Sequence, residues 1–295
     1  MPDVGRKSGH KRHKQVSRAW MLLKHAFHLA RGPLAADRQR ILFILGCQRS
    51  GTTLVTRIFE RDWNARVYNE HSELSSDDVQ FNIRLNDLNK VHKTIRRSPY
   101  PLVVAKPLVE SHRPLELLNH FENCRILWLY RSYFDVVSSD LAIFGERNGI
   151  ENIRPIVNAE QGNWRSTNVS QTVRTLLEQH FSEDMNPVDA AALFWYSRNS
   201  HFFDTGLDKE LPAGRVMLLP YQQLVTDAEN TIKGIYRLVD LPYPNSRIIA
   251  EVDPFSLGKG NSRKQEISDD VRSACDSLLG RLDQLADFQR AVSQQ

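Results

Sequence analysis

The stretch RILFILGCQRSGTTL, residues 40–54, decides the fold that this sequence predicts. Its first part, Arg40–Leu45, is apolar after the arginine, as expected for a strand buried on both faces of a sheet. A turn with two glycines follows, and a helical pattern begins at about residue 51. A strand, a glycine-containing turn and a helix in this order form a cradle for a phosphate group. The N–H groups of the turn and the helix N-terminus both point at the anion.

The turn differs from the phosphate loop of enzymes that use ATP or GTP. It keeps the G-x4-G spacing, but Thr52 and Thr53 stand where such enzymes have a lysine and a hydroxyl residue. Arg49 lies inside the turn instead. The later apolar run Arg125–Tyr130 is followed by Arg131, at a place where those enzymes carry an acidic residue for Mg²⁺. A cation there disfavours a metal ion and favours a second phosphate, so we predict a nucleotide handled without metal.

Three later apolar runs have the same character as the first, namely Leu102–Ala105, Arg125–Tyr130 and Arg215–Leu219. Helical patterns separate them, at about 51–60, 72–95, 112–121, 133–146, 169–182, 187–204, 228–239 and 269–291. Strands that alternate with helices indicate an α/β fold with a parallel sheet flanked by helices. We predict one domain over residues 32–295, preceded within residues 1–31 by a basic arm and an amphipathic helix.

The composition is that of an ordinary globular protein, with 41% hydrophobic and 25% charged residues. The longest apolar runs, Ile41–Cys47 and Pro101–Ala105, are far shorter than the roughly 18–20 residues of a membrane span. The N-terminus is basic and lacks the apolar core of a secretory signal. Three cysteines make no disulfide framework, and no C-x-x-C pair points to zinc. We therefore expect a cytoplasmic protein without a metal ion.

The net charge of +4 is concentrated at the start of the chain. Residues 1–31 contain eight Lys or Arg and one Asp, a balance of +7, whereas the remainder carries −3. Residues 16–31 predict a helix with an apolar stripe of Val16, Trp20, Leu23, Phe27 and Ala30. Two interpretations stay open: a helix packed on the body with a solvated basic face, or a peripheral contact with an anionic membrane. Nucleic-acid binding is not expected, because the arm lacks aromatic or glycine-rich interleaving.

The turn also resembles a loop of a known family. The run Arg49, Ser50, Gly51, Thr52 and Thr53 after a buried strand is similar to the 5′-phosphosulfate loop of sulfotransferases that use 3′-phosphoadenylyl sulfate (PAPS). The resemblance extends over about residues 40–265. It implies the P-loop-like fold of these enzymes, with PAPS as co-substrate and no metal ion.

Two further motifs carry the resemblance. In the family, an arginine at the end of a later strand and a serine on the next helix clamp the 3′-phosphate. Arg131 and Ser139 match this pair in spacing, with the usual Asp135 between them. The segment around Tyr221 is similar to the family's Tyr-Glu-x-Leu motif after the last core strand, so Tyr221 is a candidate cofactor contact. Gln222 replaces the usual Glu there, and any role of that acid is absent.

The proton acceptor is sought near the loop. Tyrosylprotein sulfotransferases and related enzymes have their catalytic Glu at the corresponding distance from the loop arginine, which implies Glu70 as general base. His71 stays open as the alternative, because histidine titrates near neutral pH. Lys106 matches a strand-end lysine that meets the transferring sulfonate in many sulfotransferases. The aryl-type enzymes have a histidine two residues after that lysine, and Leu108 stands here instead, which favours Glu70.

Other matches are weaker. In the family a loop from the region of residues 255–264 closes over the cofactor, which makes Lys259 and Ser262 candidate contacts. Trp195 and Asn199 resemble a Trp and Asn often present on the corresponding helix, although core packing also explains the tryptophan.

Together these features predict transfer of a sulfonate group from PAPS to an acceptor hydroxyl on a carbohydrate, lipid or other small molecule. Glu70, Lys106 and Arg49 are the predicted catalytic residues. Two alternatives stay open: an atypical P-loop kinase or nucleotide-dependent transferase, and a protein that binds a membrane surface or nucleic acid through its basic arm. The acceptor and the oligomeric state are not determined by the sequence.

Overall fold

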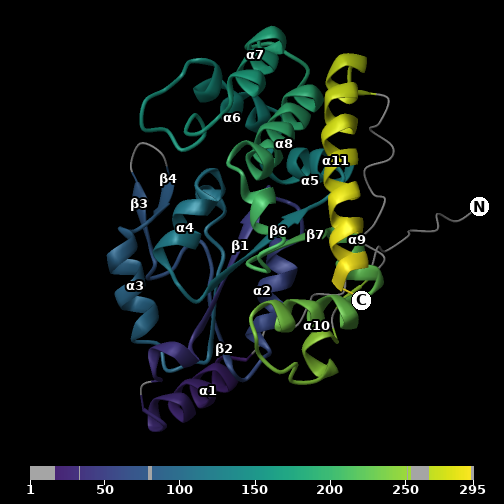
Figure 1. The fold of residues 1–295 in the computed structure, drawn as a ribbon. Helices are drawn as coiled ribbons and strands as arrows, with labels where there is room; N and C mark the ends of the chain where they lie inside the picture. Colours follow the sequence, from purple (N-terminus) through teal and green to yellow (C-terminus); the bar gives the residue numbers. More distant parts are fainter. Residues whose placement is uncertain (1–16, 33, 79–81, 251, 254–265, 294–295) are drawn as a thin grey trace, which may run out of the picture.

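The sheet at the centre of the molecule has five parallel strands, in a computed structural model that describes residues 17–32, 34–78, 82–250, 252–253 and 266–293 (Figure 1). The strands are β1 (Arg40–Gly46), β2 (Ala65–Tyr68), β5 (Leu102–Ala105), β6 (Cys124–Tyr130) and β7 (Val216–Pro220). Their order across the sheet is β2-β5-β1-β6-β7, and every neighbouring pair is parallel. The predicted fold class, a parallel α/β sheet flanked by helices, is confirmed.

Helices cover both faces of this sheet. They are α1 (Arg18–Ala30), α2 (Thr52–Glu60), α3 (Leu88–Arg96), α4 (Pro114–His120), α5 (Tyr133–Phe144), α6 (Arg147–Val157), α7 (Gln171–His180), α8 (Pro187–Asp204), α9 (Tyr221–Thr226), α10 (Ala228–Leu238) and α11 (Asp269–Ser293). The long helices α8 and α11 lie side by side over the sheet (Figure 1).

Strand β1 shows why its apolar run must be continuous. Successive side chains of a strand point to opposite faces of the sheet. Phe43 and Leu45 enter the core formed with α5, α8 and α11, whereas Leu42 and Ile44 enter the core formed with α2, α9 and α10. All four side chains are fully buried. The central strand is therefore apolar on both faces, and its carboxyl end delivers the phosphate loop to the edge of the sheet.

One predicted helix is wrong over its first half. Residues 72–95 were expected to be helical, but the structure has an antiparallel hairpin of β3 (Ser75–Asp78) and β4 (Asn82–Leu85) before α3. The side chain of Asp87 caps α3 by accepting hydrogen bonds from the N–H groups of Asn89 and Lys90, which sets the start of that helix. Serine and aspartate at 75–78 have weak helix propensity, so tertiary contacts decide their conformation. Helix α6 was not predicted.

The N-terminal helix packs on the body, but not with its polar face in solvent. Lys24 and His28 are its buried side chains, at 5% and 3% exposure. Leu23, which belongs to the predicted apolar stripe, is 62% exposed. The expectation of a solvated basic face is therefore wrong for these two residues. No helix in the described part of the chain is both long and apolar enough to cross a membrane.

Substitution of Gly46 tests how closely β1 packs against β6 at the point where the loop begins. Gly46 has φ +127°, and a Cβ built on it would lie 2.2 Å from the carbonyl oxygen of Leu129 on β6. We expect Gly46→Ala to lower the free energy of unfolding by about 2 kcal/mol or more, because the backbone of a central strand must shift. Urea unfolding measures this.

Gly280→Ala is the matched control. Gly280 lies within α11 and has no atom within 4 Å of an added Cβ, so alanine there should be neutral or stabilising by up to about 1 kcal/mol. Equal stability of the two variants would contradict the close packing of β1 against β6.

Candidate active site

The phosphate loop, residues 47–51, turns sharply between β1 and α2. Arg49 has φ +62° and Gly51 has φ +93°, both in the left-handed region that L-residues rarely adopt. Gly51 caps α2, whose first N–H groups have no acceptor within the helix. The turn therefore directs free backbone donors and the positive end of the helix dipole to one place. That arrangement binds an anion.

A buried hydroxyl in the loop supports the same conclusion. Ser50 is fully buried, and its Oγ has no hydrogen-bond partner among the described residues. Thr52, which begins α2, is 3% exposed. Buried polar atoms are normally paired, so an unpaired one in a loop of this shape indicates a missing ligand atom. The residues present thus fit a phosphate or phosphosulfate group.

Arg49 connects the loop to the second motif. Its Nε donates a hydrogen bond to Ser139 Oγ on α5 at 3.0 Å. Burial lowers the pKa of Arg49, the charge of Asp140 raises it, and the nearby charge of Arg131 lowers it. Two guanidinium groups held close enough to repel each other create a positive potential that an anion would relieve.

Arg131 brings in the third motif. Its Nη2 lies 3.0 Å from Asp135 Oδ2, and its guanidinium lies over the ring of Tyr221, 4.5 Å from the centroid. The carbonyl of Arg131 accepts a hydrogen bond from Trp195 Nε1 at 2.9 Å, so this tryptophan does more than fill the core. The Tyr221 ring in turn lies against Gly51, where an added Cβ would be 2.2 Å from the ring. All three sequence motifs therefore meet at one edge of the sheet.

Glu70 and Lys106 meet beside the loop. They follow the carboxyl ends of β2 and β5, which are paired in register at Tyr68 and Ala105. Lys106 Nζ lies 3.3 Å from Glu70 Oε2 and 3.3 Å from Thr53 Oγ1 on α2. Lys106 is buried, whereas the Glu70 side chain is 30% exposed. A carboxylate open to an acceptor is thus joined through one cation to the phosphate loop.

His71, the alternative base, lies elsewhere. Its side chain is 82% exposed, and its Nδ1 is 3.9 Å from the carboxylate of Asp77. A small pocket beside the loop is lined by Glu70 and Lys106, together with Tyr68 and residues of the β3–β4 hairpin such as Arg84. His71 does not line this pocket. The geometry favours Glu70 over its neighbour.

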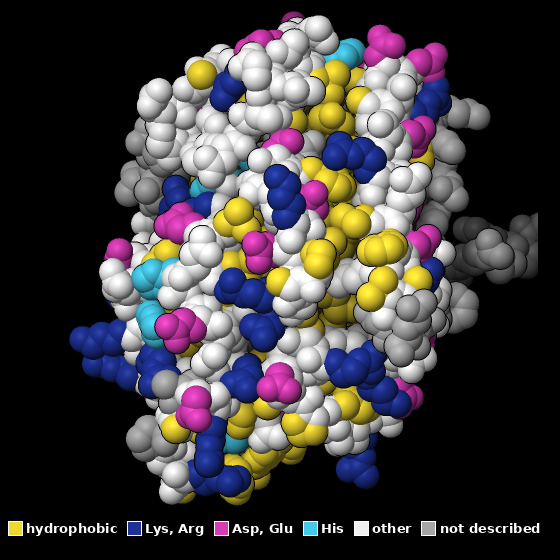
Figure 2. All heavy atoms as spheres, in the orientation of Figure 1, with side chains coloured by type: hydrophobic (Ala, Val, Ile, Leu, Met, Phe, Trp, Pro, Cys, Tyr) yellow, Lys and Arg dark blue, Asp and Glu magenta, His cyan; other side chains and the backbone are white. Residues whose placement is uncertain are grey.

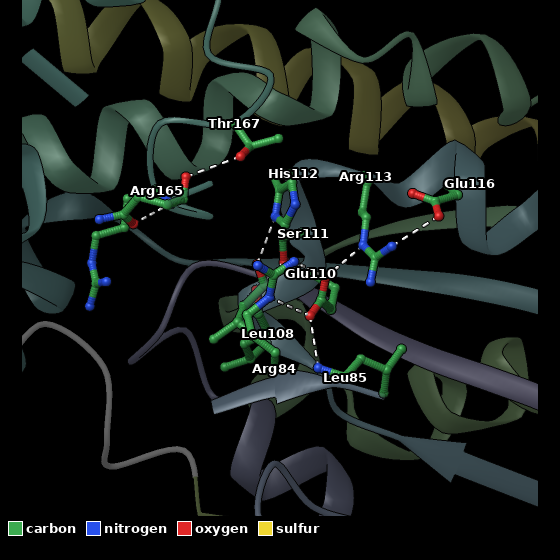
Figure 3. A network of polar contacts seen from close by, with 12 residues as sticks. Arg84, Leu85, Leu108, Glu110, Ser111, His112, Arg113, Glu116, Arg165 and Thr167 are labelled. Atoms are coloured by element: carbon green, nitrogen blue, oxygen red, sulfur yellow. Dashed lines mark hydrogen bonds and ion pairs between the residues drawn. The ribbon is translucent and has the colours of Figure 1, made fainter. Parts of the chain in front are cut away.

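The sequence reasoning missed the buried carboxylate that holds the hairpin in place. Glu110 has no exposed side-chain surface, and it accepts hydrogen bonds from Arg84 Nε at 3.1 Å, Arg113 Nε at 2.6 Å and the Leu85 N–H at 2.9 Å (Figure 3). Burial raises the pKa of Glu110, but the Arg84 hydrogen bond and the charges of both arginines outweigh this and hold the pKa below its usual value. Glu110 thereby ties the pocket wall to the segment after Lys106. No sequence motif marks it.

A second missed feature is a buried arginine behind the loop. Arg198 on α8 is 2% exposed and lies over the Trp164 ring at 4.8 Å, while Arg165 lies over the same ring at 4.3 Å. Burial lowers the pKa of Arg198 to about 10, and the negative charges of Glu110 and Glu70 partly oppose this shift. Arg198 thus adds a buried positive charge close enough to Glu70 for the two charges to interact.

Two further expectations concern the candidate contacts Lys259 and Ser262 and the absence of a metal ion. Lys259 and Ser262 lie outside the described residues. In the described part of the chain, no group of three or more His, Cys, Asp or Glu side chains is placed to hold a metal ion.

Fold and loop together define an α/β protein with a P-loop-like turn between β1 and α2. The family model of the sulfotransferase domain matches residues 39–273, so the chain belongs to the sulfotransferase family and is a sulfotransferase enzyme.

Solved structures agree on the fold. The sulfotransferase domain from the Synechococcus PCC 7002 olefin synthase is 15% identical, with a TM-score of 0.51, and the match covers 82% of this chain and 96% of that one. The sulfotransferase domain from the curacin biosynthetic pathway is also 15% identical, with a TM-score of 0.50 and coverage of 83% and 98%. At this identity the likeness concerns the fold alone. The search of curated proteins found no match.

The reactivity of the cysteine thiols measures how tightly the loop is packed. Cys47 lies in the loop, and burial raises its pKa to about 12. Burial also raises the pKa of Cys124 to about 12 and that of Cys275 well above its usual value. Because only the thiolate reacts, and a raised pKa leaves the thiol protonated, we expect the native protein at pH 8 to resist a disulfide reagent such as Ellman's.

In the denatured chain all three cysteines should react with the reagent and release its coloured product. They are free and buried in the native state. Rapid labelling of one native thiol, absent in Cys47→Ser, would show that the loop is open and would contradict the packing described.

Proposed function

We propose that this sulfotransferase moves a sulfonate group from PAPS to an acceptor hydroxyl on a carbohydrate, lipid or other small molecule, without a metal ion. The observation that carries the proposal is the position of Lys106 Nζ, 3.3 Å from both Glu70 Oε2 and Thr53 Oγ1. It joins a candidate base to the phosphate loop through a single positive charge.

Donor binding is assigned to the three converging motifs. The loop amides, Ser50 and the first turn of α2, with Thr52 and Thr53, would hold the 5′-phosphosulfate. Arg131 and Ser139 would hold the 3′-phosphate, since a forked guanidinium and a hydroxyl suit a phosphate dianion. The contact of Arg49 Nε with Ser139 Oγ supports a continuous row of donors between the two phosphates.

Tyr221 is assigned as a cofactor contact because its ring lies against both Arg131 and Gly51. The Tyr221 ring separates Arg131 from Gly51, which keeps the guanidinium at the strand end rather than in the loop. Trp195 fixes the backbone of Arg131 from the other side. These aromatic residues position the arginine, and we assign them no chemical step.

In the transfer, the acceptor oxygen forms a bond to sulfur while the bond between sulfur and the phosphate oxygen breaks. The acceptor proton passes to the Glu70 carboxylate, and the electron pair of the broken bond stays on the phosphate of adenosine 3′,5′-bisphosphate. Lys106 and Arg49 offset the negative charge that builds on the leaving oxygen. Arg198 contributes to the same potential from behind the loop.

Donor binding is tested by calorimetric titration with adenosine 3′,5′-bisphosphate without metal, beside ATP with Mg²⁺. We expect a dissociation constant in the micromolar range for the bisphosphate. Arg131→Ala should weaken binding by about tenfold or more, because a charged hydrogen-bond donor is lost. Arg290→Ala is the matched control: this arginine is 51% exposed and pairs with Asp287 on α11.

If the protein binds no bisphosphate, or prefers ATP with Mg²⁺, the donor assignment is wrong. The kinase-like alternative would then replace it.

The base is tested by comparing two neighbouring residues. Glu70→Gln keeps the shape of the side chain but removes the proton acceptor, so we expect kcat to fall about 10²–10⁴-fold with bisphosphate binding retained. His71→Ala removes an exposed side chain and should leave kcat nearly unchanged. Turnover is measured as bisphosphate release from PAPS, with the first alcohol of a sugar, lipid and phenol panel that the wild type accepts.

The reverse pattern, in which His71→Ala is inactive and Glu70→Gln active, would assign the base to the histidine.

A further inference from the structure

Helix α1 is turned so that its leucines face outward, while Trp20 and Phe27 lie against the ring of Trp63. Leu22, Leu23 and Leu29 are 71%, 62% and 56% exposed. By contrast, Lys24 and His28 are buried against the body. Of the exposed large hydrophobic side chains in the described part of the chain, more than half lie on this one helix. Surface helices of globular proteins normally show the opposite orientation.

Specific polar contacts fix this orientation. His28 Nε2 donates a hydrogen bond to the carbonyl of Trp63 at 2.9 Å, and Lys24 Nζ donates one to the carbonyl of Glu60 at 3.4 Å. Burial lowers the pKa of both side chains, that of Lys24 to about 8. Rolling the leucines inward would break both hydrogen bonds and leave the carbonyl groups of Glu60 and Trp63 without these donors.

Helix α1 carries Arg18 at its start and Arg31 at its C-cap, and residues 18–31 contain no acidic side chain. The sequence of residues 1–31 carries a balance of +7. Arg31 and Arg38 line a cavity of about 440 Å³ beside the C-terminal end of α1. Figure 2 shows hydrophobic side chains gathered at the lower end of the molecule, where α1 lies in Figure 1, next to Lys and Arg side chains. An apolar ridge with a basic border is complementary to an anionic lipid surface.

We propose that α1 docks the protein on a bilayer that contains anionic lipid. The leucine face, which we define as Met21, Leu22, Leu23 and Leu29, enters the interface between headgroups and acyl chains, and the basic residues meet the lipid charge. A second copy of the chain is a poorer occupant. A two-fold pairing of α1 helices would bring two segments of +7 together.

The position of α1 has a consequence for the site. The helix packs against Trp63 and Tyr100, which precede β2 and β5, whereas Glu70 and Lys106 follow these strands. Docking therefore occurs at the amino edge of the sheet, and the candidate active site faces away from the bilayer. The docked enzyme would act on groups that reach it from the aqueous side.

The test is co-sedimentation of the full chain with sucrose-loaded vesicles of phosphatidylcholine alone or with phosphatidylserine, at physiological salt. We expect binding only to the vesicles with phosphatidylserine. Replacing two residues of the leucine face, Leu22→Ser with Leu29→Ser, should lower the partition coefficient by about tenfold or more. The control pair Phe288→Ser with Val292→Ser changes side chains of similar exposure, 65% and 55%, on α11 and should bind as the wild type does.

Thermal unfolding and bisphosphate titration verify that both double variants remain folded, since all four side chains are exposed. Thermal unfolding does not depend on the proposed donor, so the docking proposal and the proposed function can fail separately. The docking proposal is overturned by absence of vesicle binding, or by binding that the leucine variant leaves unchanged. It is also overturned by a wild-type dimer that only the leucine variant abolishes, which would assign the face to a second copy.

Discussion

The turn by which the backbone leaves β1 and enters α2 constrains everything else at the site. Gly46 lies so close to the carbonyl of Leu129 that no side chain fits, and the left-handed conformations of Arg49 and Gly51 swing the chain back into a helix. The first turn of α2 therefore points its free N–H groups toward the carboxyl edge of the sheet. Any anion bound there lies within reach of side chains from the neighbouring strand ends.

The surrounding residues convert this turn into a charged, partly buried site. Arg131 is held by the ring of Tyr221 and by the indole of Trp195, so its position depends on α8 and α9 as much as on β6. Lys106 connects Glu70 to Thr53. The site also keeps the guanidinium groups of Arg49 and Arg131 close enough that each disfavours the charge of the other, and an anionic ligand would relieve this repulsion.

The N-terminal helix α1 lies at the opposite edge of the sheet, and different side chains determine how it packs. There a lysine and a histidine are buried to satisfy carbonyl groups, and leucines remain outside. Hydrophobic burial normally determines which face of a helix packs inward, but at α1 the requirement to pair buried polar groups determines it. The two edges of the sheet thus carry different features, the phosphate-loop turn at one and a helix with exposed leucines at the other.

The sequence alone determined the buried strands β1, β5, β6 and β7, the phosphate loop and the strand-end residues Arg131 and Lys106. Parallel strands bring their carboxyl ends to one edge, so residues that follow them converge. Only the tertiary structure decided that residues 75–85 form a hairpin, that Glu110 anchors it, and that α1 turns its leucines outward. These features depend on contacts between segments distant in sequence, and the local spacing of apolar residues does not identify such partners.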